Sequence, residues 1–358
     1  MKHLVDWIVL KFPIFRLVFA FKVFAECLYY ASIWLLVVGR STALEMNQAE
    51  VLRLAERVFG EAGFKVSAQC ISRPSCFDLV ARKSGSIAFI RVPANLSCAC
   101  RSEIDELKTI AGFFGGSALL VCDKAKDRPL EDDTVYSRYG VLAISPGTLE
   151  DVVAEGSLPL VLAGPGGYYV RLDGGAIKKR RLKLGMSMGK LAESLGVSRR
   201  TLYGYEHGMA KASVSAAYKL EWFLGVPVVE PIDILTPVKH TRSFLAAARR
   251  VLIRNRLLHR VLRWLSRCRF DVFPARKAPF DFVAECPEKK LCLVGGVSCS
   301  NDRNLDARTK EILSISEVVR ARSVFITDGT QVPENDIPLV YHEELAKIRE
   351  PKDLISKL

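Results

Sequence analysis

The sequence lacks the closely spaced cysteines and histidines that are typical of zinc-binding or disulfide-rich proteins. Its ten cysteines include no pair separated by two residues, and it has only five histidines. Structural zinc sites need closely spaced Cys and His ligands, so we expect neither a metal nor another cofactor. Cys122 and Cys292 lie in apolar strand-like runs, where cysteine acts as a small core residue. This pattern indicates a cytoplasmic protein, although the cytosol of a hyperthermophile also permits disulfides.

Acidic residues are scarce beside basic ones. The 358 residues carry 52 Lys and Arg against 39 Asp and Glu, a net charge of +13. Nine basic and two acidic residues lie between 176 and 211, and twelve basic and one acidic residue lie between 239 and 277. Such clustering is typical of a surface that binds a polyanion such as double-stranded DNA. A solvated basic face without a ligand remains the alternative, chiefly for the second cluster.

Residues 187–208 predict a helix, a tight turn and a second helix. Apolar residues recur at helical spacing behind a Ser187 N-cap, and Gly196 permits the left-handed C-cap that ends this first helix. The second helix opens at Ser198 and buries Tyr205. Its first turn therefore offers basic side chains where a recognition helix meets base edges.

These residues resemble the helix-turn-helix of phage-repressor/Cro-type regulators. In that family an Arg on the first helix pairs with a Glu at the end of the recognition helix, and Arg181 and Glu206 occupy those positions. The resemblance extends over about five helices, from Gly174 to Gly225, and implies DNA binding. The alternative is a helical hairpin in an unrelated domain.

The expected roles in DNA binding divide into positioning and reading. Phosphates would be held by Ser187, Lys190, Lys178 and Lys179, with the Arg249–Arg269 stretch adding further backbone contacts. The bases would be read by the exposed start of the second helix, and Arg181 and Glu206 would brace that helix. The reading surface is expected to comprise Ser198, Arg199, Arg200, Tyr203 and Gly204, bordered by Met188 and His207.

The first 45 residues are strongly hydrophobic. Residues 23–38 are about as long as a minimal membrane span but contain Glu26. This segment could associate with a membrane and would then tether a DNA-binding protein. It could instead be a non-spanning extension, or translation could start at Met46, where an amphipathic helix begins.

Two segments on either side of the helix-turn-helix share one pattern. From Met46 the order is helix, three strands, helix and two strands, which indicates an α/β domain over residues 46–165. After a Pro-rich linker at 229–240, matching stretches recur in the same order over 241–358. The sequence therefore predicts an internal duplication flanking a helix-turn-helix domain at 173–228.

The repeated domain resembles restriction-endonuclease-like nucleases, which hold Mg²⁺ between a strand-borne Asp and a Glu-x-Lys on the next strand. Asp78 and Asp281 match the first ligand. The second element is absent, because Phe89-Ile90-Arg91 and Leu293-Val294-Gly295 stand in its place. A single carboxylate holds Mg²⁺ poorly, so we expect non-catalytic domains, with a DNA or RNA nuclease or repair factor as the alternative. The paired aspartates could equally be structural caps, and Glu103, Asp105 and Glu106 are expected on a solvated helix face.

The arrangement from Met46 to about Leu235 is similar to a family of archaeal Cro-type transcriptional regulators. The shared features are a Cys-Phe-Asp-x-Val-Ala strand, a Tyr-x-Arg-Tyr-Gly segment at 136–140, a Tyr-Val-Arg-x-Asp strand at 169–173 and a Pro-Ile-Asp tail at 231–233. The resemblance implies control of transcription in an archaeal cytoplasm. Such regulators commonly bind as homodimers, although the two α/β copies could instead pair within one chain.

Overall fold

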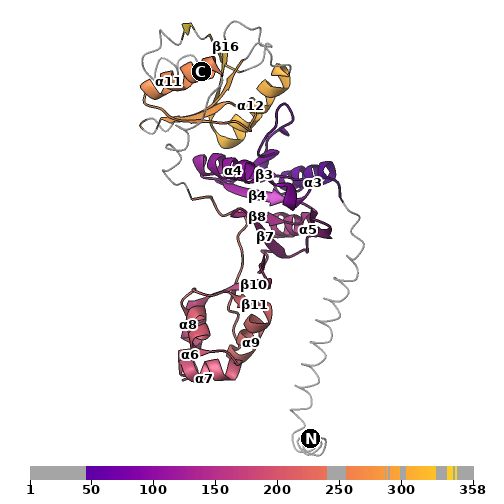
Figure 1. Cartoon of the computed structure of the whole chain (residues 1–358), viewed down its shortest axis with the longest axis vertical. Coiled ribbons are helices and arrows are strands. Elements are labelled where there is room, and N and C mark those ends of the chain that lie inside the picture. Colours follow the sequence, from indigo (N-terminus) through magenta and orange to yellow (C-terminus); the bar gives the residue numbers. More distant parts are fainter. Residues whose placement is uncertain are drawn as a thin grey trace, which may run out of the picture. The chain divides into compact units, whose positions relative to one another are not determined.

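The computed structural model describes residues 46–239, 255–286, 288, 291–298, 304–327, 337–341 and 343–344 (Figure 1). The hydrophobic extension expected over residues 1–45, with its proposed membrane association, lies outside this described part. None of the described helices is long and apolar enough to cross a membrane.

The first α/β region, Gln48–Glu155, opens with a capped helix. Asn47 Oδ1 accepts the Glu50 backbone N–H at 3.0 Å, and the Asn47 N–H donates to Glu50 Oε2 at 2.8 Å, a capping box. The elements of this region are α3 (Gln48–Glu61), β1 (Lys65–Val66), β2 (Leu79–Lys83), β3 (Ser86–Arg91), η1 (Leu96–Cys98), α4 (Arg101–Phe113), β4 (Ser117–Val121), β5 (Lys124–Ala125), β6 (Arg128–Pro129), β7 (Thr134–Arg138), β8 (Val141–Ile144), α5 (Pro146–Glu150) and η2 (Asp151–Glu155).

The central strands of this region are buried, as their apolar sequences require. The strand order is β1-β2-β3-β4-β8-β7, and β3, β4 and β8 run parallel. The turn between β7 and β8 places Tyr139 at φ 49° and Gly140 at φ 83°. The Tyr-x-Arg-Tyr-Gly segment is therefore the end of a β-hairpin, in which a glycine tolerates the left-handed backbone.

A second hairpin continues this sheet into the helix-turn-helix region, Gly174–Leu224. It consists of β9 (Val161–Gly164) and β10 (Gly167–Leu172), and β9 pairs in parallel with β7. β10 then pairs with the short strands β11 (Ala212–Ser213) and β12 (Val229–Glu230). One strand is thus shared between the sheet and the domain that carries the helices.

The helices of this region pack around their own apolar core, and Figure 1 shows them gathered together. They are α6 (Gly174–Lys183), α7 (Met188–Leu195), α8 (Arg199–Glu206) and α9 (Val214–Leu224). Between Gly174 and Gly225, where every residue is described, there are four helices, one fewer than the five expected. After Gly225 the chain extends into β12, because Pro227 and Pro231 disfavour another helix.

The Pro-rich segment 229–240 is not a solvated linker over its described residues. The Ile232 N–H donates to the Pro159 carbonyl oxygen at 2.9 Å, and the Val238 N–H donates to that of Gly116 at 2.9 Å. Ile232 and Ile234 are buried. This segment therefore packs along the first α/β region.

The described part of the second α/β region, Arg256–Tyr341, likewise combines helices with one sheet. Its strands follow the order β13-β14-β15-β16-β17, with β15, β16 and β17 parallel. The described elements are α11 (Arg256–Arg267), β13 (Asp271–Pro274), β14 (Phe282–Cys286), β15 (Leu291–Val297), α12 (Leu305–Val319), β16 (Arg322–Thr327) and β17 (Leu339–Tyr341).

One hydrophobic core joins the two α/β regions. The rings of Phe77 and Phe280, each directly before the aspartate of its region, lie 6.2 Å apart. Helix α12 packs on β15 and β16 and also on β2 of the first region. The two regions therefore share buried apolar surface, the main source of stability in a folded domain.

Polar contacts across this interface include glutamates from both regions. Glu106 Oε1 accepts the Arg276 and Lys277 N–H groups at 2.6 and 2.9 Å, while Glu311 Oε1 accepts those of Ile71 and Ser72 at 2.9 and 2.8 Å. Glu103 accepts from Lys277 Nζ at 2.6 Å. The expectation that Glu103 and Glu106 lie on a solvated face was wrong, because α4 covers a loop some 170 residues away along the chain.

Candidate nucleic-acid interface

Helices α7 and α8 are joined by a tight turn, and each helix begins at a serine that caps it. Ser187 Oγ accepts the Lys190 N–H at 3.2 Å, and Ser198 Oγ accepts the Thr201 N–H at 3.0 Å. Between them Gly196 adopts φ 68°, where a side chain would be strained. The start of α8 is therefore fixed at Ser198.

A buried ion pair holds α8 from its other end. Arg181 Nε and Nη2 donate to the two carboxylate oxygens of Glu206 at 2.6 and 3.0 Å, while Nη1 donates to the Met186 carbonyl at 3.0 Å. The hydrogen bond to Glu206 raises the pKa of the Arg181 guanidinium. Both side chains are buried, so the pair fixes α8 against α6 in one orientation.

The close approach of α6 to α8 depends on Gly174. A Cβ at this position would overlap the Glu206 and Tyr205 carbonyl groups, which are backbone atoms and cannot yield. The end of α8 thus rests directly on the start of α6.

The first turn of α8 exposes Arg199 and Arg200. The Arg199 guanidinium lies against α7, since a Cβ at Gly189 would come within 2.7 Å of Arg199 Nε. The Arg200 side chain is not among the atoms that a Cβ on any described glycine would meet. Arg199 therefore extends across α7, and Arg200 is exposed on the same turn.

An aromatic pair, which the sequence did not reveal, extends this surface. The rings of Tyr203 and His207 stack with centroids 3.9 Å apart, and His207 Nδ1 lies 2.8 Å from the Tyr203 carbonyl oxygen. Tyr203 is 47% exposed. The spacing of four residues along one helix was the available signal, because such pairs meet on a helix surface.

Two predicted surface residues lie deeper than expected. Gly204 was expected to be exposed, and this was wrong: it is buried, and a Cβ there would come within 3.1 Å of Ala210 Cβ. Its carbonyl accepts the Met209 N–H at 2.8 Å. Met188 is half-buried against the helical core. Gly204 therefore offers no side chain to a base edge.

The expected phosphate-binding side chains lie at the surface of α6 and α7. Lys178, Lys179 and Lys190 are exposed, and among the described residues none of them forms an ion pair. The second basic cluster is described only in part. Its members on α11 are exposed along one side of that helix: Arg256, Arg260, Arg263 and Arg267. Lys239, Arg269 and Arg276 are exposed outside α11.

The aspartate of the nuclease-like pattern is neutralised in the first α/β region. Arg91 Nη1 lies 2.6 Å from Asp78 Oδ1, and the Val92 N–H donates to Oδ2 at 2.6 Å. Burial raises the pKa of the Asp78 carboxyl, and Arg91 opposes that rise. The arginine found in place of the expected lysine thus binds the carboxylate directly.

The aspartate of the second α/β region has cations on both oxygens. Arg73 of the first region lies 2.9 Å from Asp281 Oδ1, while Oδ2 accepts from Arg308 and, at 2.6 Å, from the Val297 N–H. No group of three His, Cys, Asp or Glu in the described part of the chain could hold a metal ion.

Comparison with known proteins gives two domain families and a set of full-length relatives. Residues 48–159 match a PD-(D/E)XK superfamily domain, and residues 177–230 match a helix-turn-helix. Proteins named "Putative HTH-type transcriptional regulatory protein" occur in Methanosarcina barkeri, at 35% identity over 84% of this chain and 93% of the relative, and in Pyrococcus furiosus, at 31% over 87% and 97%. One from Thermococcus kodakarensis is 31% identical over 87% of this chain and 95% of its own length.

Proposed function

Because the chain belongs to this family of archaeal HTH-type transcriptional regulatory proteins, it is a DNA-binding transcriptional regulator, and we propose that α8 reads its operator in the major groove. The observation that carries the proposal is the exposed first turn of α8, where Arg199 and Arg200 directly follow the Ser198 cap. A cytoplasmic location at the chromosome follows from this role.

We assign separate tasks to the two sides of the surface. Arg200 and Tyr203 read base edges, and Arg199, held over Gly189, reads the bases nearest α7. Phosphates are bound by the N-terminus of α7, with Ser187 and Lys190, and by Lys178 and Lys179 on α6. His207 borders the surface through its stack on Tyr203.

The test begins by sequencing genomic fragments bound by the protein at about physiological salt, which yields an operator. Affinity is then measured for the operator and for a scrambled duplex. Arg200→Ala should lose about 1 to 3 kcal/mol on the operator only, whereas Lys179→Ala should weaken both duplexes and lower the salt slope by about one. Arg53→Ala, an exposed arginine on α3, is the matched control. Equal losses on both duplexes for Arg200→Ala would remove the base-reading assignment.

We further propose that the PD-(D/E)XK-like domain is a non-catalytic scaffold. Arg91 binds the carboxylate that would otherwise hold a metal ion. Incubation with duplex DNA or RNA and Mg²⁺ should leave both at full length, with Asp78→Asn giving the same result. Mg²⁺-dependent shortening that Asp78→Asn abolishes would establish the nuclease alternative instead.

We infer that the second α/β region is a second copy of the first. Asp78 and Asp281 precede corresponding strands, and each accepts a backbone N–H from the end of the next strand, at Val92 and Val297. Glu106 and Glu311 cap corresponding loops of the opposite region. A structure solved by experiment should superpose Leu79–Lys83 on Phe282–Cys286 and α4 on α12; a different strand order in residues 328–345 would contradict the duplication.

We propose that two chains occupy one operator, because each chain carries one recognition helix. Two half-sites about 10 to 10.5 base pairs apart would then be bound together. Inserting about five base pairs between them turns the half-sites to opposite faces of the duplex and should weaken binding, whereas a single half-site bound equally well would indicate a monomer.

A further inference from the structure

An open surface pocket of about 730 Å³, called the cavity below, lies where the first α/β region meets the β9–β10 hairpin. This volume is within the range of sites that bind small molecules. DNA binding by α8 makes no use of it. The cavity is lined by Leu96, Ala125, Arg128, Pro129, Leu130, Glu131, Tyr136, Ser137, Ala163, Gly164, Pro165, Gly167 and Tyr168.

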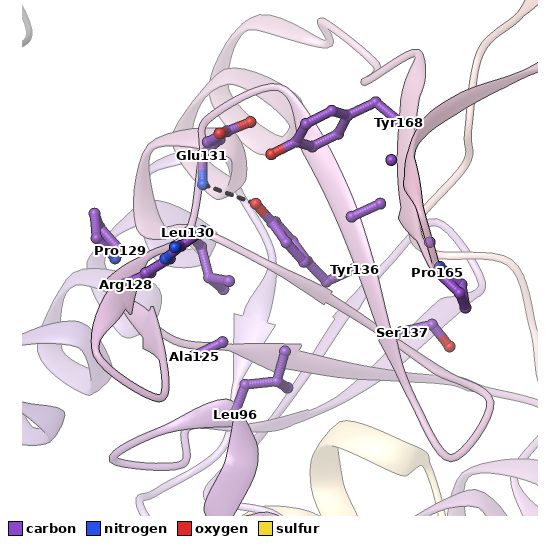
Figure 2. Close-up of a pocket in the computed structure, with 13 residues that line it drawn as sticks. Leu96, Ala125, Arg128, Pro129, Leu130, Glu131, Tyr136, Ser137, Pro165 and Tyr168 are labelled. Carbon is purple, nitrogen blue, oxygen red and sulfur yellow. Dashed lines mark hydrogen bonds between the residues drawn. The ribbon is translucent and has the colours of Figure 1, made fainter. Parts of the chain in front are cut away.

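Its polar end consists of one carboxylate and two phenols. Figure 2 shows the hydroxyl groups of Tyr136 and Tyr168 directed toward each other and toward Glu131. The Tyr136 oxygen accepts the Glu131 backbone N–H at 3.1 Å, which leaves the phenol proton to donate elsewhere. A hydrogen bond to the Glu131 carboxylate, with burial, raises the pKa of Tyr168 to about 12. Both phenols are therefore neutral donors at physiological pH.

The remaining wall is largely apolar. Leu96, Pro129 and Leu130 come from the first α/β region, and Ala163 and Pro165 come from the hairpin. A carboxylate beside two aromatic rings attracts a cation by ion pairing and by the negative ring faces. The apolar wall provides the surface for a hydrocarbon body attached to that cation. Together these features select an organic ammonium over an inorganic ion.

We propose that this cavity is an effector site that binds a small organic ammonium with an apolar body and alters operator binding. The effect on operator binding rests on the proposed function, whereas binding of the ammonium to the cavity is independent of DNA. The ammonium can belong to a free amine or to an amino acid, and Arg128 on the rim would favour the carboxylate of the latter.

The connection to DNA runs through β10, which carries Tyr168. The residue after Tyr168 in this strand, Tyr169, lies opposite Ser213 of β11 in the sheet. Ser213 Oγ in turn caps α9 by accepting the Ala216 N–H at 3.2 Å. At the end of the same strand, Asp173 Oδ1 caps α6 by accepting the Ala176 N–H at 2.8 Å. A ligand that shifts β10 therefore shifts α6, which packs on α8, and α9, which packs on α6 and α7.

Titration calorimetry on the full chain tests the site with three probes of one hydrocarbon body. 2-Phenylethylamine has the ammonium, L-phenylalanine has both charges, and 3-phenylpropionate has only the carboxylate. We expect the amine or the amino acid to bind at least tenfold more tightly than the propionate. Whichever of these two binds more tightly shows whether the ammonium belongs to a free amine or to an amino acid. Preference for the propionate, or no binding by any probe at millimolar concentration, would overturn the proposal.

Matched variants locate the binding. Glu131→Gln should weaken the ammonium probe at least tenfold, and Glu155→Gln, a change of an exposed glutamate outside the cavity, should not. Operator affinity measured with and without the bound probe should then differ several-fold in the wild type and not in Glu131→Gln. Probe binding that leaves operator affinity unchanged would overturn the effector role, whereas failure of the ligand-free protein to bind any operator would count against the proposed function instead.

Discussion

Arg91 pairs with a buried carboxylate in the first α/β region, because its guanidinium contacts Asp78, which is 8% exposed. Arg91→Ala should lower the free energy of unfolding by about 2 to 3 kcal/mol, less than for a fully buried pair since Arg91 is partly exposed. Urea denaturation measures this change. Arg101→Ala breaks the exposed pair with Asp105 and should cost no more than about 1 kcal/mol. Equal losses would mean that Arg91 contributes only as a surface charge.

The cysteines should differ sharply in reactivity. Hydrogen bonds from the Ser102 hydroxyl and the Glu103 backbone lower the pKa of the exposed Cys100, whereas burial raises that of Cys122 to about 12. The thiolate is the reactive form, so Cys100 should be alkylated at lower pH than an ordinary cysteine. Peptide mapping after iodoacetamide treatment across pH 6 to 9 measures this. Ser102→Ala should move the midpoint of Cys100 upward, and an unmoved midpoint would contradict the assigned cause.

At the scale of elements, the recognition helix depends on its buried brace. Glu206→Ala leaves the Arg181 guanidinium buried without its partner, which should cost about 3 to 5 kcal/mol. Thermal unfolding followed by circular dichroism tests this, with Glu193→Ala on the exposed side of α7 as the control. Loss of operator binding without loss of stability would instead assign Glu206 to the DNA contact.

Gly189 offers a separate test of α7 and α8. Gly189→Ala should leave stability unchanged or raise it by up to about 1 kcal/mol, because alanine favours the helix and the atom it meets is the end of a flexible arginine. The displaced Arg199 should lower operator affinity nonetheless. Anisotropy titration of the variant with the operator measures the effect, and unchanged affinity would show that Arg199 does not need its place over Gly189.

The elements that could be predicted from sequence are those with local signals. Caps and a glycine turn mark α7 and α8, since Ser187, Gly196 and Ser198 act within a few residues. Strands β7 and β9 were missed because they are short and depend on pairing: β7 pairs with β8 and β9, and β9 pairs also with β10. The burial of Gly204 against Ala210 and the pocket around Tyr136 likewise arise from the fold, and no local pattern encodes them.

At the scale of the whole molecule, the two α/β regions should unfold as one. Phe77 is fully buried and packs on both Phe89 and Phe280, so Phe77→Ala should cost about 3 to 5 kcal/mol. Hydrogen exchange followed by mass spectrometry should then show faster exchange in β14 and β16 as well as in β2. Ile71→Ala, at an exposed apolar residue of the same interface loop, should change neither. Faster exchange confined to the first region would mean that the regions open independently.

The contact between the two α/β regions has a consequence for cellular abundance. Since both halves belong to one polypeptide, they meet at an effective concentration fixed by the connecting chain, and dilution cannot separate them. Two molecules that bind one operator together, as proposed above, would have no such connection. The number of copies in a cell would therefore set how often operators are occupied, while each molecule keeps its paired body even when it is rare.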